Sequence, residues 1–198
     1  ASVDDNVGRV TDFLRARGEF DDTVLMYASD QGFFLGDHGW FDKRFMYDKS
    51  MSTPLLMRWP GKIAPSQSQA LVQNIDFAPT LLDMAGVPIP SWMQGKSLLP
   101  VATGKKQALK RDHLYYHYYE FVKDHTVIPH LGIRGQRYKL IYFYTVNEWQ
   151  FYDLQKDPME QHNLIQEKKY RATISRLKKG LQKLRDHYED HEPAGELR

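Results

Sequence analysis

The sequence predicts an α/β fold that carries a small antiparallel sheet and a terminal amphipathic helix. Three observations support this: a helix-period apolar pattern followed by a short apolar run, a group of aromatic strand-forming segments in the second half, and a long amphipathic pattern near the end. Strand-rich sequence grouped after an α/β portion is typical of a second layer or subdomain. We therefore predict an α/β core at residues 1–104 and a sheet subdomain at residues 105–198, separated at a basic, polar stretch.

The first part of the chain predicts helix and strand in alternation. Apolar residues at steps of four and three positions define one helical face: Val3, Val7, Val10 and Leu14. Gly18 is a helix stop, and the apolar run Thr23–Ala28 then predicts a strand that is buried on both faces and forms one arm of a parallel layer. A second helix is predicted from Asp76, as its N-cap, to Gly86, as its stop.

The second half is rich in residues with high strand propensity. Four segments are predicted as strands: 114–122, 131–134, 138–144 and 149–154. Gly135 and Gln136, between the second and the third of these, predict a tight hairpin. From Tyr170 to Tyr188, apolar residues recur at four- and three-residue steps with Lys and Arg between them. This pattern predicts an amphipathic helix that packs against the chain's own sheet.

Composition excludes several classes of protein. The net charge of +2 is too small to indicate binding to nucleic acid or to an anionic membrane. No run of about 18 apolar residues exists, so no membrane span is expected. The chain has no cysteine, which excludes disulfides and thiolate metal sites.

A charged, glycine-rich loop after the first predicted strand is the candidate functional site. Asp30 and Gln31 follow the strand directly, and their side-chain oxygens suit Ca²⁺ or Mg²⁺. Lys43 is a compact positive charge that can hold an anionic oxygen, and His38 can exchange a proton near neutral pH. Each residue taken singly is more often a turn cap or a solvated charge. Together, at the carboxyl end of a strand, they predict a ligand site.

This loop also resembles a known family. The resemblance is carried by S-D-Q-G-x-x-L-G-D-H-G-x-x-x-K at residues 29–43 and by T-P-L-L-M-R-W-P-G at residues 53–61. Both are similar to the second signature region of the type I, formylglycine-dependent sulfatases of the alkaline phosphatase-like superfamily. The resemblance implies that Asp30 and Gln31 are Ca²⁺ ligands, that Lys43 contacts the substrate sulfate, and that His38 lies close to the site.

The resemblance covers the carboxyl-terminal part of that family. It implies the C-terminal half of an alkaline phosphatase-like mixed-sheet sandwich, since G-I-R-x-x-R-Y-K-L-I and F-Y-D-L-x-x-D-P-x-E-x-x-N-L resemble its closing antiparallel sheet. The family's formylglycine is made from Cys or Ser in a C/S-x-P-x-R element, and an early acidic pair completes its Ca²⁺ site. This chain has no cysteine and no S-x-P-x-R, and its Asp4-Asp5 does not match the acidic pair. We therefore expect about half of an active site here, and no activity from the chain alone.

Three histidines lie among the aromatic segments: His117, His125 and His130. Their spacing matches no usual zinc pattern, so partly buried strand histidines are the plainer interpretation. A second interpretation is that His117 or His130 binds substrate, since the resemblance implies that this region lines the pocket.

The resemblance implies a secreted or periplasmic parent protein that hydrolyses the sulfate ester of a carbohydrate or an aryl compound. A phosphonate or phosphodiester hydrolase of the same superfamily is the alternative enzyme, because such families share parts of the loop pattern. Outside the enzymes, the alternative is a non-catalytic module that binds sulfated glycans through its aromatic sheet.

Overall fold

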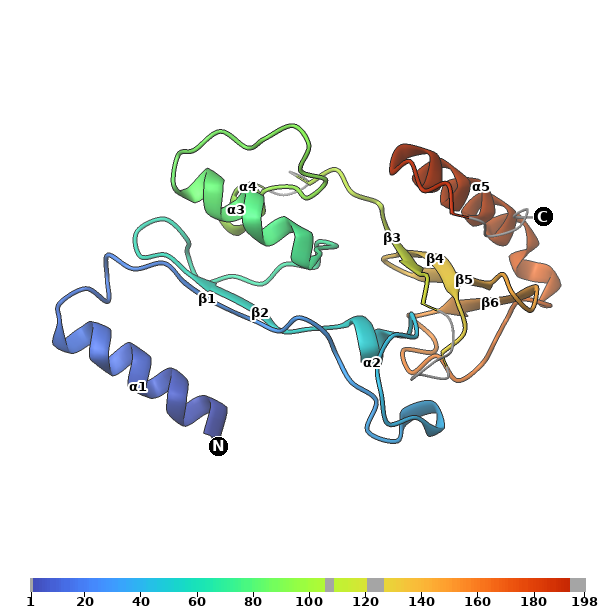
Figure 1. Cartoon of the computed structure of the whole chain (residues 1–198), viewed down its shortest axis with the longest axis horizontal. Coiled ribbons are helices and arrows are strands. Elements are labelled where there is room, and N and C mark those ends of the chain that lie inside the picture. Colours follow the sequence, from blue (N-terminus) through green and yellow to red (C-terminus); the bar gives the residue numbers. More distant parts are fainter. Residues whose placement is uncertain (1, 106–108, 121–126, 193–198) are drawn as a thin grey trace. The chain divides into compact units, whose positions relative to one another are not determined.

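The computed structural model describes residues 2–105, 109–120 and 127–192. They form two compact units, each considered by itself (Figure 1). The first is made of described residues within 1–29, 54–70 and 74–110, and the second of those within 30–53, 71–73 and 111–198. The segment 30–53, which contains the candidate site, therefore belongs to the same unit as the later sheet. The division into domains at residues 104 and 105 stays a prediction.

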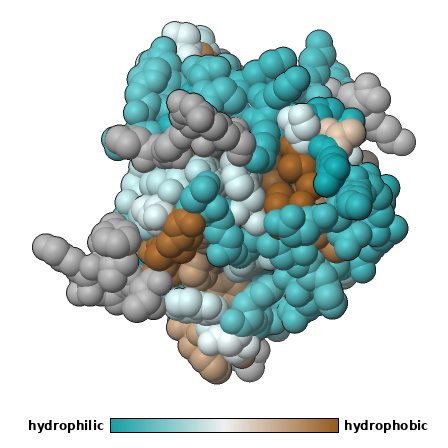
Figure 2. All heavy atoms as spheres, turned by 90° about the vertical axis from the view of Figure 1, so that its right-hand side faces the viewer, coloured by the Kyte–Doolittle hydropathy of each residue, from teal (hydrophilic) through white to brown (hydrophobic). Residues whose placement is uncertain are grey.

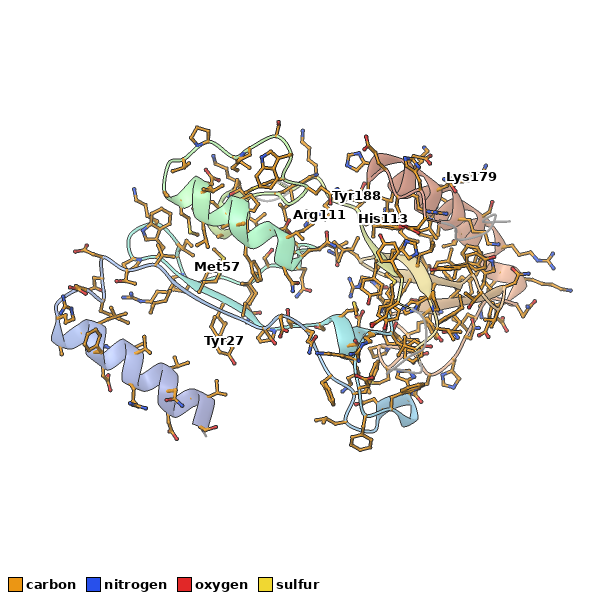
Figure 3. All side chains as sticks on the ribbon, viewed as in Figure 1. Tyr27, Met57, Arg111, His113, Lys179 and Tyr188 are labelled. Atoms are coloured by element: carbon orange, nitrogen blue, oxygen red, sulfur yellow. The ribbon has the colours of Figure 1, made fainter. Side chains whose placement is uncertain are left out.

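The first unit has one helix, a two-stranded sheet and two shorter helices: α1 (Ser2–Ala16), β1 (Leu25–Ala28), β2 (Leu55–Arg58), α3 (Phe77–Met84) and α4 (Leu99–Ala102). The predicted first helix is confirmed. The prediction of a parallel arm is wrong for the described strands, because β2 pairs antiparallel with β1. Burial on both faces is also wrong: Tyr27 is 40% exposed and pairs with Leu56, which is 65% exposed. Met57 points to the opposite face (Figure 3).

Buried polar groups at the start of α3 hold a distant segment of the first unit. Asp76 and Thr80 are fully buried. An Asp76 carboxylate oxygen accepts a hydrogen bond from the backbone amide of Lys96 (2.9 Å), and the Thr80 hydroxyl accepts one from the amide of Leu98 (2.8 Å). The predicted helix is confirmed with Asp76 as its N-cap residue, although the Asp76 side chain makes no capping hydrogen bond. Its carboxylate binds the segment at Lys96 instead of an amide of the helix.

The second unit is built on a four-stranded antiparallel sheet in the order β3-β4-β5-β6. Its strands are β3 (His113–Tyr118), β4 (His130–Gly135), β5 (Tyr138–Phe143) and β6 (Glu148–Asp153). β4 and β5 are joined by Gln136 and Arg137, so the predicted hairpin is confirmed with its turn one residue later. Successive residues of a strand face opposite sides, so that Leu140 packs on one face and Ile141 on the other.

Helix α5 (Arg171–His187) covers one face of this sheet (Figure 1). It follows a short 3-10 turn, η3 (Lys168–Tyr170). Buried residues of the helix and the sheet form one apolar cluster: Leu131, Ile133, Leu140, Tyr142, Phe151, Tyr170, Ile174, Leu177 and Leu181. Complete burial of a leucine such as Leu181 stabilises the fold by about 1.5–3 kcal/mol. The predicted packing of this helix is confirmed, and Lys179 lies on its outer side (Figure 3).

The other face of the sheet is covered by the segment 30–53, which includes η1 (Asp37–Gly39) and α2 (Asp48–Met51). Buried residues of this segment, of the sheet and of the chain next to its strands form a second cluster: Phe34, Phe45, Met46, Val127, Ile141, Phe143, Tyr152 and Leu154. The candidate loop is therefore part of the core of this unit.

On the face shown in Figure 2, hydrophilic residues predominate and hydrophobic residues gather in small patches. Among the described residues, no helix has the length and apolar character needed to cross a bilayer.

Candidate active site

Backbone hydrogen bonds close the loop that follows β1. Three amides on the outgoing chain donate to three carbonyls on the returning chain: Gly32 to Ser50 (2.8 Å), Phe34 to Asp42 (2.7 Å) and Gly36 to Trp40 (2.8 Å). Because Phe34 pairs with Asp42, Lys43 lies across from Phe33. Lys43 therefore lies on the returning chain of the same closed loop that begins at Asp30 and Gln31, and a shared site for the three residues stays a prediction.

Glycine is required at two places in this loop. A Cβ atom on Gly32 would come closer than 3.0 Å to the carbonyl oxygen of Lys49, which is closer than real Cβ atoms approach a backbone. Gly36 has a φ of 104°, in the region that side chains disfavour. The close approach at Gly32 lets the two ends of the loop share a hydrogen bond.

The three cations of the loop differ in their partners. Arg44 pairs with the carboxylate of Asp42. The Lys49 ammonium lies 3.4 Å from a carboxylate oxygen of Asp37. Lys43 is half-buried and has no carboxylate partner in the part of the chain that the structure describes. Among the described cations of the loop, Lys43 is therefore the one whose charge is left for an external anion.

Asp30 and Gln31 are the predicted metal ligands. Asp30 is exposed and Gln31 is half-buried, two and three residues after the end of β1. Their oxygens match the preference of Ca²⁺, which takes about six to eight oxygen ligands. The described residues contain no group of three or more His, Cys, Asp or Glu side chains that could hold a metal ion. The two residues thus fit part of a Ca²⁺ shell and need ligands from outside the described chain to complete it.

His38 lies within the aromatic part of the loop. Its ring stacks on Tyr47, with centroids 4.4 Å apart, and meets the edge of Phe34 at 6.0 Å. Burial lowers the pKa of His38, although Asp37 and Asp157 oppose this shift. The imidazole is therefore neutral near pH 7, the form in which it can accept a proton.

His130 is fully buried beneath the loop. Its Nε2 accepts a hydrogen bond from the backbone amide of Met46 (3.1 Å), and its Nδ1 lies 2.9 Å from the carbonyl oxygen of Ile128. Since a carbonyl can only accept, Nδ1 carries the proton and Nε2 does not. Burial lowers the pKa of His130 to about 4. Both nitrogens bind backbone groups, which favours a structural role for this ring.

The side chain of His117 is 1% exposed and lies on the opposite face of the sheet. Its Nδ1 lies 2.5 Å from a carboxylate oxygen of Asp190, and its Nε2 lies 3.3 Å from the hydroxyl of Tyr144. Burial lowers the pKa of His117, although Asp190 opposes this. Substrate binding by His117 or His130 stays a prediction, and the observed contacts favour structural roles for both. His125 lies outside the described residues.

One feature near the loop was not predicted from the sequence. Lys139 on β5 is fully buried, and its ammonium lies 2.6 Å from a carboxylate oxygen of Asp48 and 2.7 Å from one of Glu160. Arg134 lies 3.0 Å from the second carboxylate oxygen of Asp48. The alternation of side chains along a strand could have predicted this feature. It places Lys139 on the same buried face as Ile141, where a lysine must be paired.

The fold and the loop together define a class: an α/β segment whose charged loop carries oxygen donors and a lysine without a carboxylate partner among the described residues, and packs against an antiparallel sheet. Residues 36–187 match the family model described as N-sulphoglucosamine sulphohydrolase, C-terminal. The chain belongs to this sulfatase family and represents its C-terminal part. The resemblance to the sulfatases of the alkaline phosphatase-like superfamily and the predicted fold class are thus confirmed.

Similar proteins agree with this assignment. The chain is 47% identical over 196 residues to an N-acetylglucosamine-6-O-sulfatase of Bacteroides thetaiotaomicron, covering 97% of the chain and 35% of that protein. It is 30% identical over 184 residues to an arylsulfatase of Clostridium perfringens, covering 90% of the chain and 37% of that protein. The chain therefore spans little more than a third of these relatives.

Solved structures show the same fold. One, described as a complex with its substrate D-glucosamine-2-N,6-O-disulfate, has a TM-score of 0.93 and 46% identity, over 98% of this chain and 40% of that chain. A phosphonate monoester hydrolase of Agrobacterium radiobacter has a TM-score of 0.82 and 28% identity, over 93% of this chain and 39% of that chain.

Proposed function

We propose that the protein to which this chain belongs hydrolyses a sulfate ester, and that its substrate is a 6-O-sulfated glucosamine residue. The observation that carries the reaction class is the half-buried Lys43, without a carboxylate partner in the described chain, on the same closed loop as Asp30 and Gln31. Support for the substrate comes from the relative named N-acetylglucosamine-6-O-sulfatase, which matches almost the whole chain. The family also supports a secreted or periplasmic location.

Each residue of the loop has a distinct role in this proposal. Lys43 donates hydrogen bonds to the sulfate oxygens and offsets the charge that grows on them in the transition state. Asp30 and Gln31 would hold a Ca²⁺ ion, which supplies further positive charge at the same oxygens when bound. His38 would assist the leaving group: in its protonated form it gives a proton to the ester oxygen as the bond between that oxygen and sulfur breaks. The family's formylglycine nucleophile would come from outside this sequence, which has no cysteine and no S-x-P-x-R.

The test is sulfate release from 6-O-sulfated glucosamine by the full-length protein and by its Lys43→Ala variant. Removing a charged contact to the reacting group is expected to lower kcat/KM by about 10²–10³-fold. Lys49→Ala is the matched control, because Lys49 is exposed and pairs with Asp37 on the same loop. Its kcat/KM should stay within about threefold of the parent value, as expected for loss of an exposed ion pair.

Two other results would redirect the assignment. Turnover of a phosphonate monoester or a phosphodiester, with no release of sulfate, would favour the alternative enzyme class. Affinity for sulfated glycan without any turnover, and without Ca²⁺, would favour a non-catalytic binding module.

The metal role has a separate test. Removal of Ca²⁺ from the full-length protein by a chelator should abolish sulfate release, and addition of Ca²⁺ should restore it. Asp30→Asn keeps the size of the side chain but removes its charge, so the variant should bind Ca²⁺ at least about tenfold more weakly by calorimetry. Unchanged Ca²⁺ affinity in this variant would remove Asp30 from the site.

A further inference from the structure

A buried ionic cluster lies between the loop and the sheet. It is formed by Lys139 and Arg134 of the sheet, by Asp48 at the start of α2, and by Glu160. The cluster contains two positive and two negative side chains, so its formal charge is zero. The side chains of Lys139 and Glu160 are only 1% and 2% exposed, so this pair is almost completely withdrawn from water.

Burying this ionic cluster is an unfavourable way to stabilise a core, because its charges lose their contact with water. Withdrawing a charged pair from water is unfavourable, and well-packed apolar side chains at such positions often make a protein equally stable or more stable. Ile141 lies two positions along the same strand, on the same face, and is fully buried without any polar contact. An apolar residue would therefore suit position 139 if packing were the only requirement. What the charges add is a fixed position for Asp48.

Asp48 is held at three points. Its two carboxylate oxygens bind Lys139 (2.6 Å) and Arg134 (3.0 Å), and its backbone amide donates to Glu160 (2.6 Å). Lys139 and Arg134 outweigh the effect of burial and lower the pKa of Asp48, so its carboxylate stays charged. The first turn of α2 is thereby fixed in position against β4 and β5.

Two residues later, α2 fixes both ends of the loop. The buried Ser50 accepts the amide of Gly32 at its carbonyl (2.8 Å) and the amide of Arg44 at its hydroxyl (2.8 Å). Gly32 is the neighbour of Gln31, and Arg44 is the neighbour of Lys43. A short path of contacts thus leads from the buried cluster to two of the proposed site residues.

We propose that Lys139 is a positioning residue, which acts through Asp48 to hold Lys43 and Gln31 in their working arrangement. The catalytic consequence rests on the proposed function, whereas the positioning itself does not. Lys139 touches neither the loop cation nor the oxygen donors, so its effect passes through the chain of contacts at Asp48 and Ser50.

The test compares two variants of the full-length protein, Lys139→Met and Lys139→Met/Glu160→Gln. The single change leaves Glu160 as a buried unpaired charge, so the melting temperature should fall. The double change removes that charge and should recover much of the melting temperature. Because both variants lose the contact between Lys139 and Asp48, kcat should remain at least tenfold below the parent value in both, with KM changed by less than threefold.

Arg137→Met is the matched control on the same sheet. Arg137 pairs with Asp153 (2.8 Å), which also accepts a hydrogen bond from Tyr170 near α5, away from the loop. Its removal should lower the melting temperature while leaving kcat unchanged. Recovery of kcat together with melting temperature in the Lys139 double variant would overturn the proposal, since a merely stabilising cluster behaves in that way.

Hydrogen exchange separates the failure of this inference from failure of the proposed function. In Lys139→Met/Glu160→Gln, the amides of Gly32 and Arg44 should exchange at least tenfold faster, while those of β5 keep their protection. This measurement needs no substrate. Parent-like protection at both amides would overturn the proposal even if the protein proves to be a sulfatase, whereas faster exchange supports it whatever ester the protein hydrolyses.

Discussion

Gly32→Ala is expected to destabilise the candidate site more than any other single-methyl change in the loop. The new Cβ would lie closer than 3.0 Å to the carbonyl oxygen of Lys49, and the Gly32–Ser50 hydrogen bond (2.8 Å) holds the two segments too close together to accommodate it. The backbone must move, which costs about 1–3 kcal/mol as in other overpacked sites. A displacement of this kind, on the order of 1 Å at Gln31, should lower kcat of the full-length protein about 10²-fold.

The control for Gly32→Ala is Gly8→Ala in α1. A Cβ on Gly8 meets no atom of the described residues within 4 Å, and Gly8 lies in the interior of a helix, where alanine is preferred to glycine by about 0.5–1 kcal/mol. This variant should have unchanged kcat and equal or higher stability. Calorimetry and sulfate release measure both effects. Parent-like kcat in Gly32→Ala would show that the loop tolerates a shift at Gln31.

Local patterns predicted the elements whose residues interact with near neighbours in the chain. The steps of four and three between Ile174, Leu177 and Leu181 describe one face of α5 wherever the helix lies. The turn at Gln136 likewise needed only two adjacent strand-forming segments. Asp30 and Lys43 could be placed on one loop because the glycines between them favour tight turns.

Pairings between distant residues were not predicted, for a physical reason. The direction of β1 depends on which strand lies beside it, and β2 supplies an antiparallel neighbour from thirty residues away. Lys139 and Asp48 are separated by 91 residues, so neither sequence segment alone shows why a lysine occupies a buried strand position. The family resemblance suggested a substrate contact for His130, whereas its backbone partner Met46 is 84 residues distant.

The contact between His130 and Met46 predicts that the second unit loses stability in acid. The pKa of about 4 in the folded chain lies below the value of about 6.5 expected for an unfolded histidine. A lowered folded pKa means that this stabilisation is complete above about pH 6.5 and is lost as the pH falls toward 4, because only the unfolded chain takes up the proton. At about 1.4 kcal/mol per pKa unit, the loss reaches about 3 kcal/mol by pH 4.

Burial is the main cause of the lowered pKa of His130, and the contact with Met46 adds a conflict between two donors. Protonation would place a hydrogen on Nε2, directly facing the amide hydrogen of Met46, while Nδ1 remains bonded to Ile128. In the full-length protein, the protection of the Met46 amide, corrected for its intrinsic exchange rate, should therefore fall between pH 6.5 and 4. His130→Gln keeps an acceptor but cannot titrate, so protection should be lower at neutral pH and nearly constant with pH. The exposed His162 supplies the control, because His162→Gln should leave the change of Met46 amide protection with pH as it is in the parent protein. If His130→Gln also leaves that change unaltered, the acid sensitivity belongs to other groups.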